Sequence, residues 1–179
     1  MVFVALVRGI NVGGYKQVAM ADLRKLAADL GFEDARTLLQ SGNLVFRSAM
    51  RSPAQVEHAL QTEAAKRLGF DADFFVRTPT ELDAVIARNP FGTEAERDPG
   101  HLLVMFLKQP PARGAVAAVQ DAISGRELVK TDGKHAYIVY PDGIGRSRLT
   151  FGLLEKKLGT RATGRNWNTV LKLRTAASG

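Results

Sequence analysis

Residues 2–14 read VFVALVRGINVGG. The continuous apolar run Val2–Val7 predicts a buried strand. Arg8 follows the run directly, and the glycines after it permit positive φ and close approach of the backbone. The chain is therefore expected to leave the strand through a flexible corner that carries the guanidinium of Arg8 and the amide of Asn11.

The residues after this corner predict the order strand, helix, strand, strand, helix, strand up to residue 77. Apolar residues at helical spacing indicate a helix over Met20–Leu30, which Gly31 ends. Ser52-Pro53-Ala54-Gln55 is a capping box that opens a helix running to about Leu68. The remaining strands of this half are expected at residues 35–40, 44–47 and 73–77.

The second half predicts the same order after a short helix that begins near Thr78 and a linker or long loop over 89–100. A hairpin is expected around Asp132-Gly133, a strong turn pair. The other expected elements are a strand at 102–107, a helix at 111–123, hairpin strands at 127–130 and 135–140, a helix at 148–158, a strand at 160–163 and a helix at 166–175.

This element order is that of the split βαβ, or ferredoxin-like, unit, in which two helices cover one face of an antiparallel sheet. We therefore predict an α+β fold of two ferredoxin-like (βαββαβ, α/β plait) subdomains plus a C-terminal helix. The expected boundaries are 1–78 for the first subdomain, 79–100 for the connecting helix and loop, and 101–179 for the second subdomain with the C-terminal helix. The repeat is one of topology, because the residues of the two halves show no obvious match.

The charge of the chain is concentrated in its second half. The chain has 179 residues and a net charge of +7, and residues 100–179 hold 13 basic against 5 acidic residues. Such asymmetry indicates a surface that faces a polyanion, or alternatively a solvated basic face that keeps the protein soluble. The absence of cysteine excludes disulfides and thiolate metal sites, and no apolar run reaches the roughly 20 residues of a membrane span. A cytoplasmic protein without a membrane partner is expected.

Three polar clusters are candidates for binding. The corner after the first strand has free amides, a guanidinium and a nearby lysine that suit a phosphate or carboxylate, although it equally suits a plain turn. The hairpin tip at 40–43 favours turn chemistry, and a cluster at 161–167 combines two arginines, an expected helix cap and the chain's single tryptophan. The ligand-binding candidates are Arg8, Asn11, Gly13, Gly14, Lys16, Gln40, Ser41, Asn43, Arg161, Arg165, Asn166 and Trp167.

Several kinds of site are not supported by the sequence. The three histidines are scattered without ligand spacing, so no metal site is expected, and no motif calls for a cofactor. Ser41 lacks a nucleophile-elbow context, and no pair of carboxylates stands out for acid–base catalysis. Tyr137 and Tyr140 differ in parity and face opposite sides of their strand, so the aromatic signature of RNA-recognition domains is missing.

Three segments together resemble a known family: ALVRGINVGG at 5–14, LQSGNLVF at 39–46 and RNWNTV at 165–170. The chain is similar to the bacterial family named domain of unknown function 1697 over essentially its whole length. The resemblance implies paired ferredoxin-like subdomains, and it implies no activity, substrate, cofactor or catalytic residue. One departure is Ala19, where relatives are expected to carry proline before the first helix.

The leading hypothesis is a binding module for an anionic ligand, either nucleic acid or a phosphorylated metabolite. One alternative is an enzyme acting on a small anionic substrate between the subdomains, with the arginines and amides as polar anchors. Another is a structural or protein-interaction protein in which the signature residues serve packing. Neither the ligand nor the oligomeric state follows from the sequence.

Overall fold

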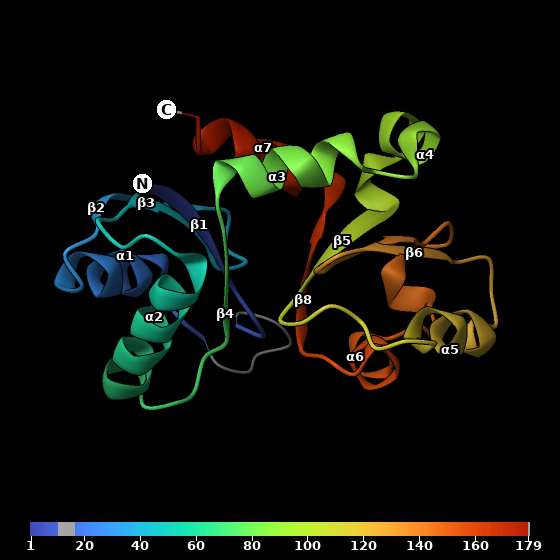
Figure 1. Ribbon diagram of the computed structural model, residues 1–179, viewed down its shortest axis with the longest axis horizontal. Coiled ribbons are helices and arrows are strands. Elements are labelled where there is room, and N and C mark those ends of the chain that lie inside the picture. The colour runs from blue at the N-terminus through green and yellow to red at the C-terminus, as the bar shows by residue number, and fades with distance from the viewer. Residues whose placement is uncertain (11–16, 179) are drawn as a thin grey trace. The chain divides into compact units, whose positions relative to one another are not determined.

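The computed structural model describes residues 1–10 and 17–178 (Figure 1). The chain forms two compact units. The first contains Met1–Asp83 together with the C-terminal residues from Lys172 onward, and the second contains Ala84–Leu171. Each unit is built around its own four-stranded antiparallel sheet.

The first sheet has the strand order β2-β3-β1-β4, with β1 (Val2–Val7) in the interior between β3 and β4. Two helices, α1 (Met20–Asp29) and α2 (Pro53–Leu68), lie on one face of this sheet (Figure 1). The chain order is therefore βαββαβ, and the predicted ferredoxin-like fold of this half is confirmed. The other strands are β2 (Glu33–Leu38), β3 (Asn43–Arg47) and β4 (Phe74–Arg77).

Both faces of β1 are buried, which explains why its sequence is continuously apolar rather than alternating. Phe3 packs into the core beneath the helices, where the rings of Phe32 and Phe46 stack with centroids 4.6 Å apart. The residues of opposite parity, Val4 and Leu6, are equally inaccessible to solvent. A strand covered on both sides selects apolar residues at every position.

The second sheet repeats this arrangement with the order β6-β7-β5-β8. Its helices are α5 (Ala115–Ala122) and α6 (Phe151–Leu158), which bury Val119, Leu154 and Leu158 against it. This confirms the predicted fold of the second half. The strands are β5 (Leu102–Leu107), β6 (Leu128–Asp132), β7 (His135–Val139) and β8 (Ala162–Asn166).

In both units the last strand runs directly into a further helix, α3 (Pro79–Ala87) after β4 and α7 (Trp167–Ala176) after β8. The start of α3 is a capping box: the backbone N–H of Thr78 donates to Glu81 Oε2 at 2.7 Å, and the N–H of Glu81 donates to Thr78 Oγ1 at 3.2 Å. The chain pattern is thus βαββαβα in each half. The unit boundary falls within α3, and the last part of α7 belongs to the first unit.

The segment 89–100 differs from the expected linker or loop, because it contains the short helix α4 (Gly92–Arg97) and the 3-10 turn η1 (Pro99–His101). The side chain of Asn89 holds the start of this segment by accepting a hydrogen bond from the N–H of Phe91 at 3.0 Å. Phe91 is itself buried. A Pro- and Gly-rich composition indicates turns but does not exclude a one-turn helix anchored in this way.

Several helices and strands begin or end at other residues than the sequence predicts, because local capping and turn residues set their ends. α5 begins at Ala115 rather than 111 because Gly114, with φ of 79°, precedes its first turn. α6 begins at Phe151 rather than 148 because Thr150 caps it, accepting from the N–H of Leu153 at 3.3 Å. In the second hairpin Asp132 pairs with His135, so the two turn residues are 133 and 134 rather than 132 and 133. β8 starts and ends two to three residues later than the expected strand at 160–163.

Two classes of feature are not found in the described part of the chain. None of its helices has the length and apolar character needed to cross a bilayer. Across residues 1–10 and 17–178, histidine, aspartate and glutamate side chains form no group of three or more that could hold a metal ion.

Candidate functional site

The corner after β1 and the hairpin between β2 and β3 lie together at one end of the first sheet. The backbone N–H of Val7 donates to the carbonyl of Gly42 at 2.8 Å, and the N–H of Arg8 donates to the carbonyl of Asp73 at 2.9 Å. The Arg8 guanidinium also lies 3.8 Å from the Asp73 carboxylate. Two of the three predicted clusters are therefore neighbours, with an acidic side chain beside the arginine.

The remaining candidates of the first cluster, Asn11, Gly13, Gly14 and Lys16, lie outside the described residues. Their proposed part in binding an anion stays a prediction. The structure describes the two residues before them, Gly9 with a positive φ of 67° and Ile10, which is buried. The chain thus turns sharply at Gly9 and is anchored by an apolar side chain before it enters the undescribed segment.

At the hairpin tip, Asn43 serves the turn. Its side chain is fully buried and its Nδ2 donates to the carbonyl of Leu38 at 2.8 Å and to Ser41 Oγ at 2.9 Å. Gln40 and Ser41 are exposed at the surface. The expectation that turn chemistry dominates this hairpin fits these contacts, and Gln40 and Ser41 are the hairpin candidates that solvent reaches.

The third cluster, in the second unit, is largely built into the fold. Arg165 is buried, and its Nη1 donates to Thr163 Oγ1 at 2.9 Å and to the carbonyl of Gly164 at 2.8 Å. Burial lowers the pKa of Arg165 to about 10, so the guanidinium still carries its charge at neutral pH. Trp167 is 6% exposed and offers no open ring for stacking. The ring is packed inside the protein instead, at the start of α7.

Asn166 is the N-cap that the sequence predicts. Its Oδ1 accepts from the backbone N–H of Thr169 at 3.0 Å and from Thr169 Oγ1 at 2.9 Å. Since the cap oxygen satisfies one of the N–H groups at the start of α7, the side chain has a structural task.

Replacing Asn166 by alanine is expected to lower the free energy of unfolding by about 1 kcal/mol, because an N–H at the start of α7 loses its acceptor. Chemical denaturation measures this loss. The control is Asn168→Ala, since Asn168 is exposed on the same helix. Equal stability of the two variants would show that the Asn166 cap contributes nothing.

Arg161 belongs to a group that the sequence interpretation did not assemble. The N–H of Lys108 donates to the carbonyl of Arg161 at 3.0 Å, and the N–H of Leu107 donates to the carbonyl of Lys134 at 2.9 Å. The backbones of Lys108, Lys134 and Arg161 therefore lie close together, where β5 ends, where β6 turns into β7 and just before β8 begins. We name these three residues the basic strand end.

The basic strand end does not include Arg165. Arg161 and Arg165 are four residues apart along β8 and its approach, which separates them by about 13 Å in extended chain. Arg161 is exposed whereas Arg165 is buried. The structure thus divides the predicted third cluster into an accessible cation and a buried one.

Each of the two sheets has an arginine at the corresponding position of its last strand. Arg77 of β4 pairs with Val4, the third residue of β1, and Arg165 of β8 pairs with Val104, the third residue of β5. Each arginine is buried and precedes the residue that caps the following helix. Lys108 follows the last residue of β5 just as Arg8 follows the last residue of β1, so the two cations occupy equivalent positions. A cation directly after the first strand of each half is the signal by which the sequence could have revealed Lys108.

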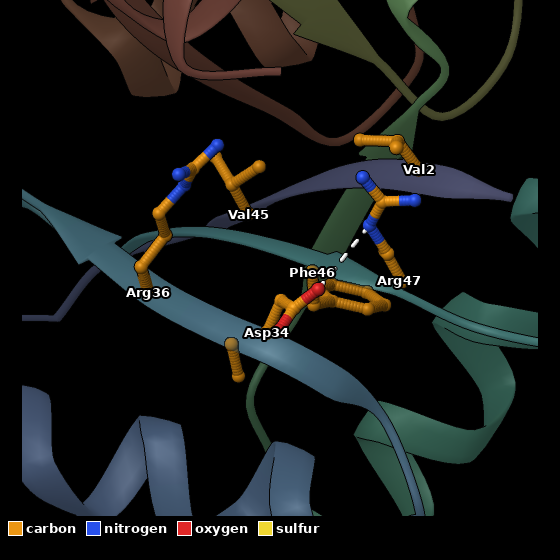
Figure 2. A pocket seen from close by; sticks show the side chains of 7 residues that line it. Val2, Asp34, Arg36, Val45, Phe46 and Arg47 are labelled. Atoms are coloured by element: carbon orange, nitrogen blue, oxygen red, sulfur yellow. Dashed lines mark ion pairs between the residues drawn. The ribbon is translucent and has the colours of Figure 1, made fainter. Parts of the chain in front are cut away.

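A pocket in the first unit lies away from all of these residues. It has a volume of about 380 Å³, and Arg36 and Arg47 line it from neighbouring strands (Figure 2). Arg47 Nε lies 3.3 Å from Asp34 Oδ2, and the Arg36 guanidinium donates to the carbonyl of Ala176. Both cations of the pocket are engaged by groups of the protein, and none of the predicted ligand-binding residues lines it.

Comparison with known proteins identifies a family, a solved structure of similar fold, and no curated relative. The family model described as protein of unknown function (DUF1697) matches residues 1–137. A solved structure of a conserved bacterial protein from Streptococcus pneumoniae is 26% identical, covers 98% of each chain and superposes with a TM-score of 0.76. No curated protein matches the sequence.

Proposed function

The chain belongs to the DUF1697 family of proteins of unknown function, and on that premise we propose that it binds an anionic, phosphate-bearing ligand through its basic strand end. The observation that carries this proposal is that Lys108, Lys134 and Arg161 lie at the same end of the second sheet. Backbone hydrogen bonds of 2.9 and 3.0 Å join Lys134 to Leu107 and Arg161 to Lys108, so the sheet holds the backbones of these positions close together. The ligand is either a nucleic acid or a phosphorylated metabolite.

Electrostatics favour an anion at this place. Residues 100–179 carry a net charge of +8, and three of the basic residues lie at the basic strand end. Two acids lie near these residues in the sequence, and both have protein partners. Asp132, two residues before Lys134, lies 3.3 Å from Arg88 Nη1. Glu155, six residues before Arg161, accepts a hydrogen bond from the backbone N–H of Ala162 at 2.8 Å at the start of β8. Lysine and arginine on fixed strands are the donors that proteins commonly present to phosphate oxygens.

Contact through charge fits the site better than contact through stacking. Trp167, Tyr137 and Tyr140 are all buried, so none of them offers a ring face to a nucleic-acid base. A nucleic acid bound here would therefore be held through its backbone, with affinity that falls steeply as salt rises. A phosphorylated metabolite would be held by the same three side chains with a weaker dependence on salt.

The test compares three ligands and two matched variants. Fluorescence anisotropy with labelled single-stranded RNA and duplex DNA, and calorimetry with inorganic pyrophosphate, are measured from low to physiological salt. The triple variant Lys108→Gln/Lys134→Gln/Arg161→Gln is expected to bind at least tenfold more weakly and, for duplex DNA, to reduce the salt slope by up to about 2.7.

The control variant Arg113→Gln/Lys156→Gln/Lys157→Gln removes the same charge from exposed positions elsewhere in the second unit. It is expected to retain most of the affinity. Equal loss in the two variants would make the binding a diffuse property of net charge. Absence of binding by all three ligands at low salt would refute the proposal, and the basic residues would then serve solubility.

A further inference from the structure

The second unit has a polar cleft at the end of its sheet opposite the basic strand end. The cleft has a volume of about 270 Å³. It lies between the connection from α5 to β6 and the connection from β7 to α6. The residues that line it include Gly125, Glu127, Asp142, Arg146, Ser147 and Arg148. None of them is among the ligand-binding candidates of the sequence.

Only one of the two carboxylate oxygens of Glu127 has a hydrogen-bond partner among the described residues. Its Oε1 accepts a hydrogen bond from Ser147 Oγ, and Ser147 Oγ in turn accepts from the N–H of Leu149 at 3.0 Å. Its Oε2 is buried and has no hydrogen-bond partner among the described residues, the one such side-chain atom in that part of the chain. A buried carboxylate oxygen of this kind is expected to receive a donor from water or from a ligand.

Gly125 is what allows the carboxylate to sit there. A Cβ added at position 125 would lie 2.5 Å from Glu127 Oε2, closer than any van der Waals contact permits. An alanine at this position would therefore displace the flexible end of the Glu127 side chain. A substitution at position 125 can therefore move the Glu127 carboxylate without removing its charge.

The cleft also contains cations. Arg146 and Arg148 are exposed and line it. The acidic group at the rim, Asp142, forms an ion pair with Arg126, whose Nε lies 3.2 Å from Asp142 Oδ2. Hydrogen bonding to Arg126 holds the pKa of Asp142 below its usual value, so the ion pair is complete at neutral pH. Acidic and basic side chains therefore line the same small cleft, and Arg126 offsets the negative charge of Asp142.

We infer that this cleft is a second binding site, for a small molecule that carries both an anionic group and a hydrogen-bond donor. The anionic group would face Arg146 and Arg148, and the donor, an amine or a hydroxyl, would face Glu127. A volume of about 270 Å³ corresponds to roughly nine water molecules, which limits the ligand to the size of an amino acid or a triose phosphate. This site is independent of the proposed function at the basic strand end.

Three probes separate the possible sources of this chemistry. The full chain is titrated with serine, glycerol phosphate and inorganic phosphate, and backbone amide shifts of residues 124–148 are followed by NMR. Serine has an amine donor, glycerol phosphate has hydroxyl donors, and phosphate at neutral pH serves as the compact anion. Saturable shifts in the cleft with serine or glycerol phosphate, at concentrations where inorganic phosphate gives none, would support the inference and identify the donor.

The variants test each end of the ligand. Arg148→Gln is expected to weaken binding at least tenfold through the anionic group, and Glu127→Gln at least tenfold through the donor. Gly125→Ala keeps every charge but moves the carboxylate, so it is expected to weaken binding in the same direction. The basic strand end triple variant is the control and is expected to bind the probe normally.

Two results would overturn the inference. Absence of shifts in the cleft with every probe would make it a water-filled crevice, and equal binding of inorganic phosphate would make it a simple anion site without a role for Glu127. Because the control variant alters the other end of the sheet, failure here leaves the proposed function standing, and failure there leaves this site standing.

Discussion

Replacing Gly42 by alanine is expected to lower the free energy of unfolding by about 3 kcal/mol. Two effects add at this position. Gly42 has a φ of 76°, where an L-residue costs about 1–2 kcal/mol. An added Cβ would also lie 2.7 Å from Ile10 Cδ1 and 3.0 Å from Val7 Cβ, and such overpacking costs about 1–3 kcal/mol.

The second hairpin provides the matched control for this substitution. Gly133 also has a positive φ, of 53°, but a Cβ there would meet no atom within 4 Å. Gly133→Ala is therefore expected to show only the backbone cost of about 1–2 kcal/mol. Chemical denaturation of both variants measures the difference. Equal losses would mean that the contact between the hairpin and the corner after β1 contributes nothing to stability.

This contact matters for the first predicted cluster. The hairpin tip approaches the corner closely enough for the N–H of Val7 to reach the carbonyl of Gly42, and a side chain at position 42 would separate them. The glycine therefore holds Gln40 and Ser41 near Arg8. A variant at Gly42 changes the geometry of that end of the sheet without removing any of its polar groups.

The fold was predictable because its signals are local. A continuous apolar run identified β1, and capping residues identified the starts of α2 and α3. These patterns depend on neighbours within four residues, which the sequence displays directly. The sequence does not predict α4, because the segment is held by the buried Phe91 and by the Asn89 side chain, which accepts from the N–H of Phe91, rather than by helical periodicity.

The site was harder to predict because it depends on register. Lys108, Lys134 and Arg161 are far apart in the chain, and only the pairing of β5 with β7 and β8 brings them together. Residue type also gives no information on burial. Asn43 and Arg165 have the donors of ligand-binding residues, yet both are buried and bond to their own hairpin or strand. No sequence pattern singles out Glu127, because its place in the cleft depends on how two loops come together in the fold.

Raising the pH above 10 is expected to destabilise the protein steeply, because two buried tyrosines must ionise. Burial raises the pKa of Tyr137 to about 12 and holds that of Tyr140 still further above its ordinary value of 10.0. Tyr137 donates to the carbonyl of Val85 at 2.8 Å and Tyr140 to that of Leu149 at 2.9 Å, so both need their protons in the folded state.

Stability falls as the pH rises because the folded chain holds the two phenolic protons more tightly than the unfolded chain does. Below pH 10 the phenols are neutral in the folded and unfolded chains, and their stabilising effect is fully present. As the pH rises from 10 towards 12, unfolding releases protons, and each tyrosine costs about 1.4 kcal/mol of stability per pH unit. The total loss from Tyr137, complete only well above pH 12, is about 2.7 kcal/mol, and Tyr140 acts in the same direction.

The double variant Tyr137→Phe/Tyr140→Phe isolates this effect. At pH 7 it is expected to lose about 1 kcal/mol for each hydrogen bond removed, whereas above pH 10 its stability should fall less steeply than that of the parent. Denaturant midpoints measured at one-unit intervals of pH give both slopes, and ultraviolet absorbance reports the tyrosinate. Parallel slopes for the two proteins would show that the buried phenols do not govern alkaline unfolding. The phenylalanine rings keep the packing at position 137 in β7 and at position 140 just after it, so any difference between the slopes is due to the hydroxyl protons.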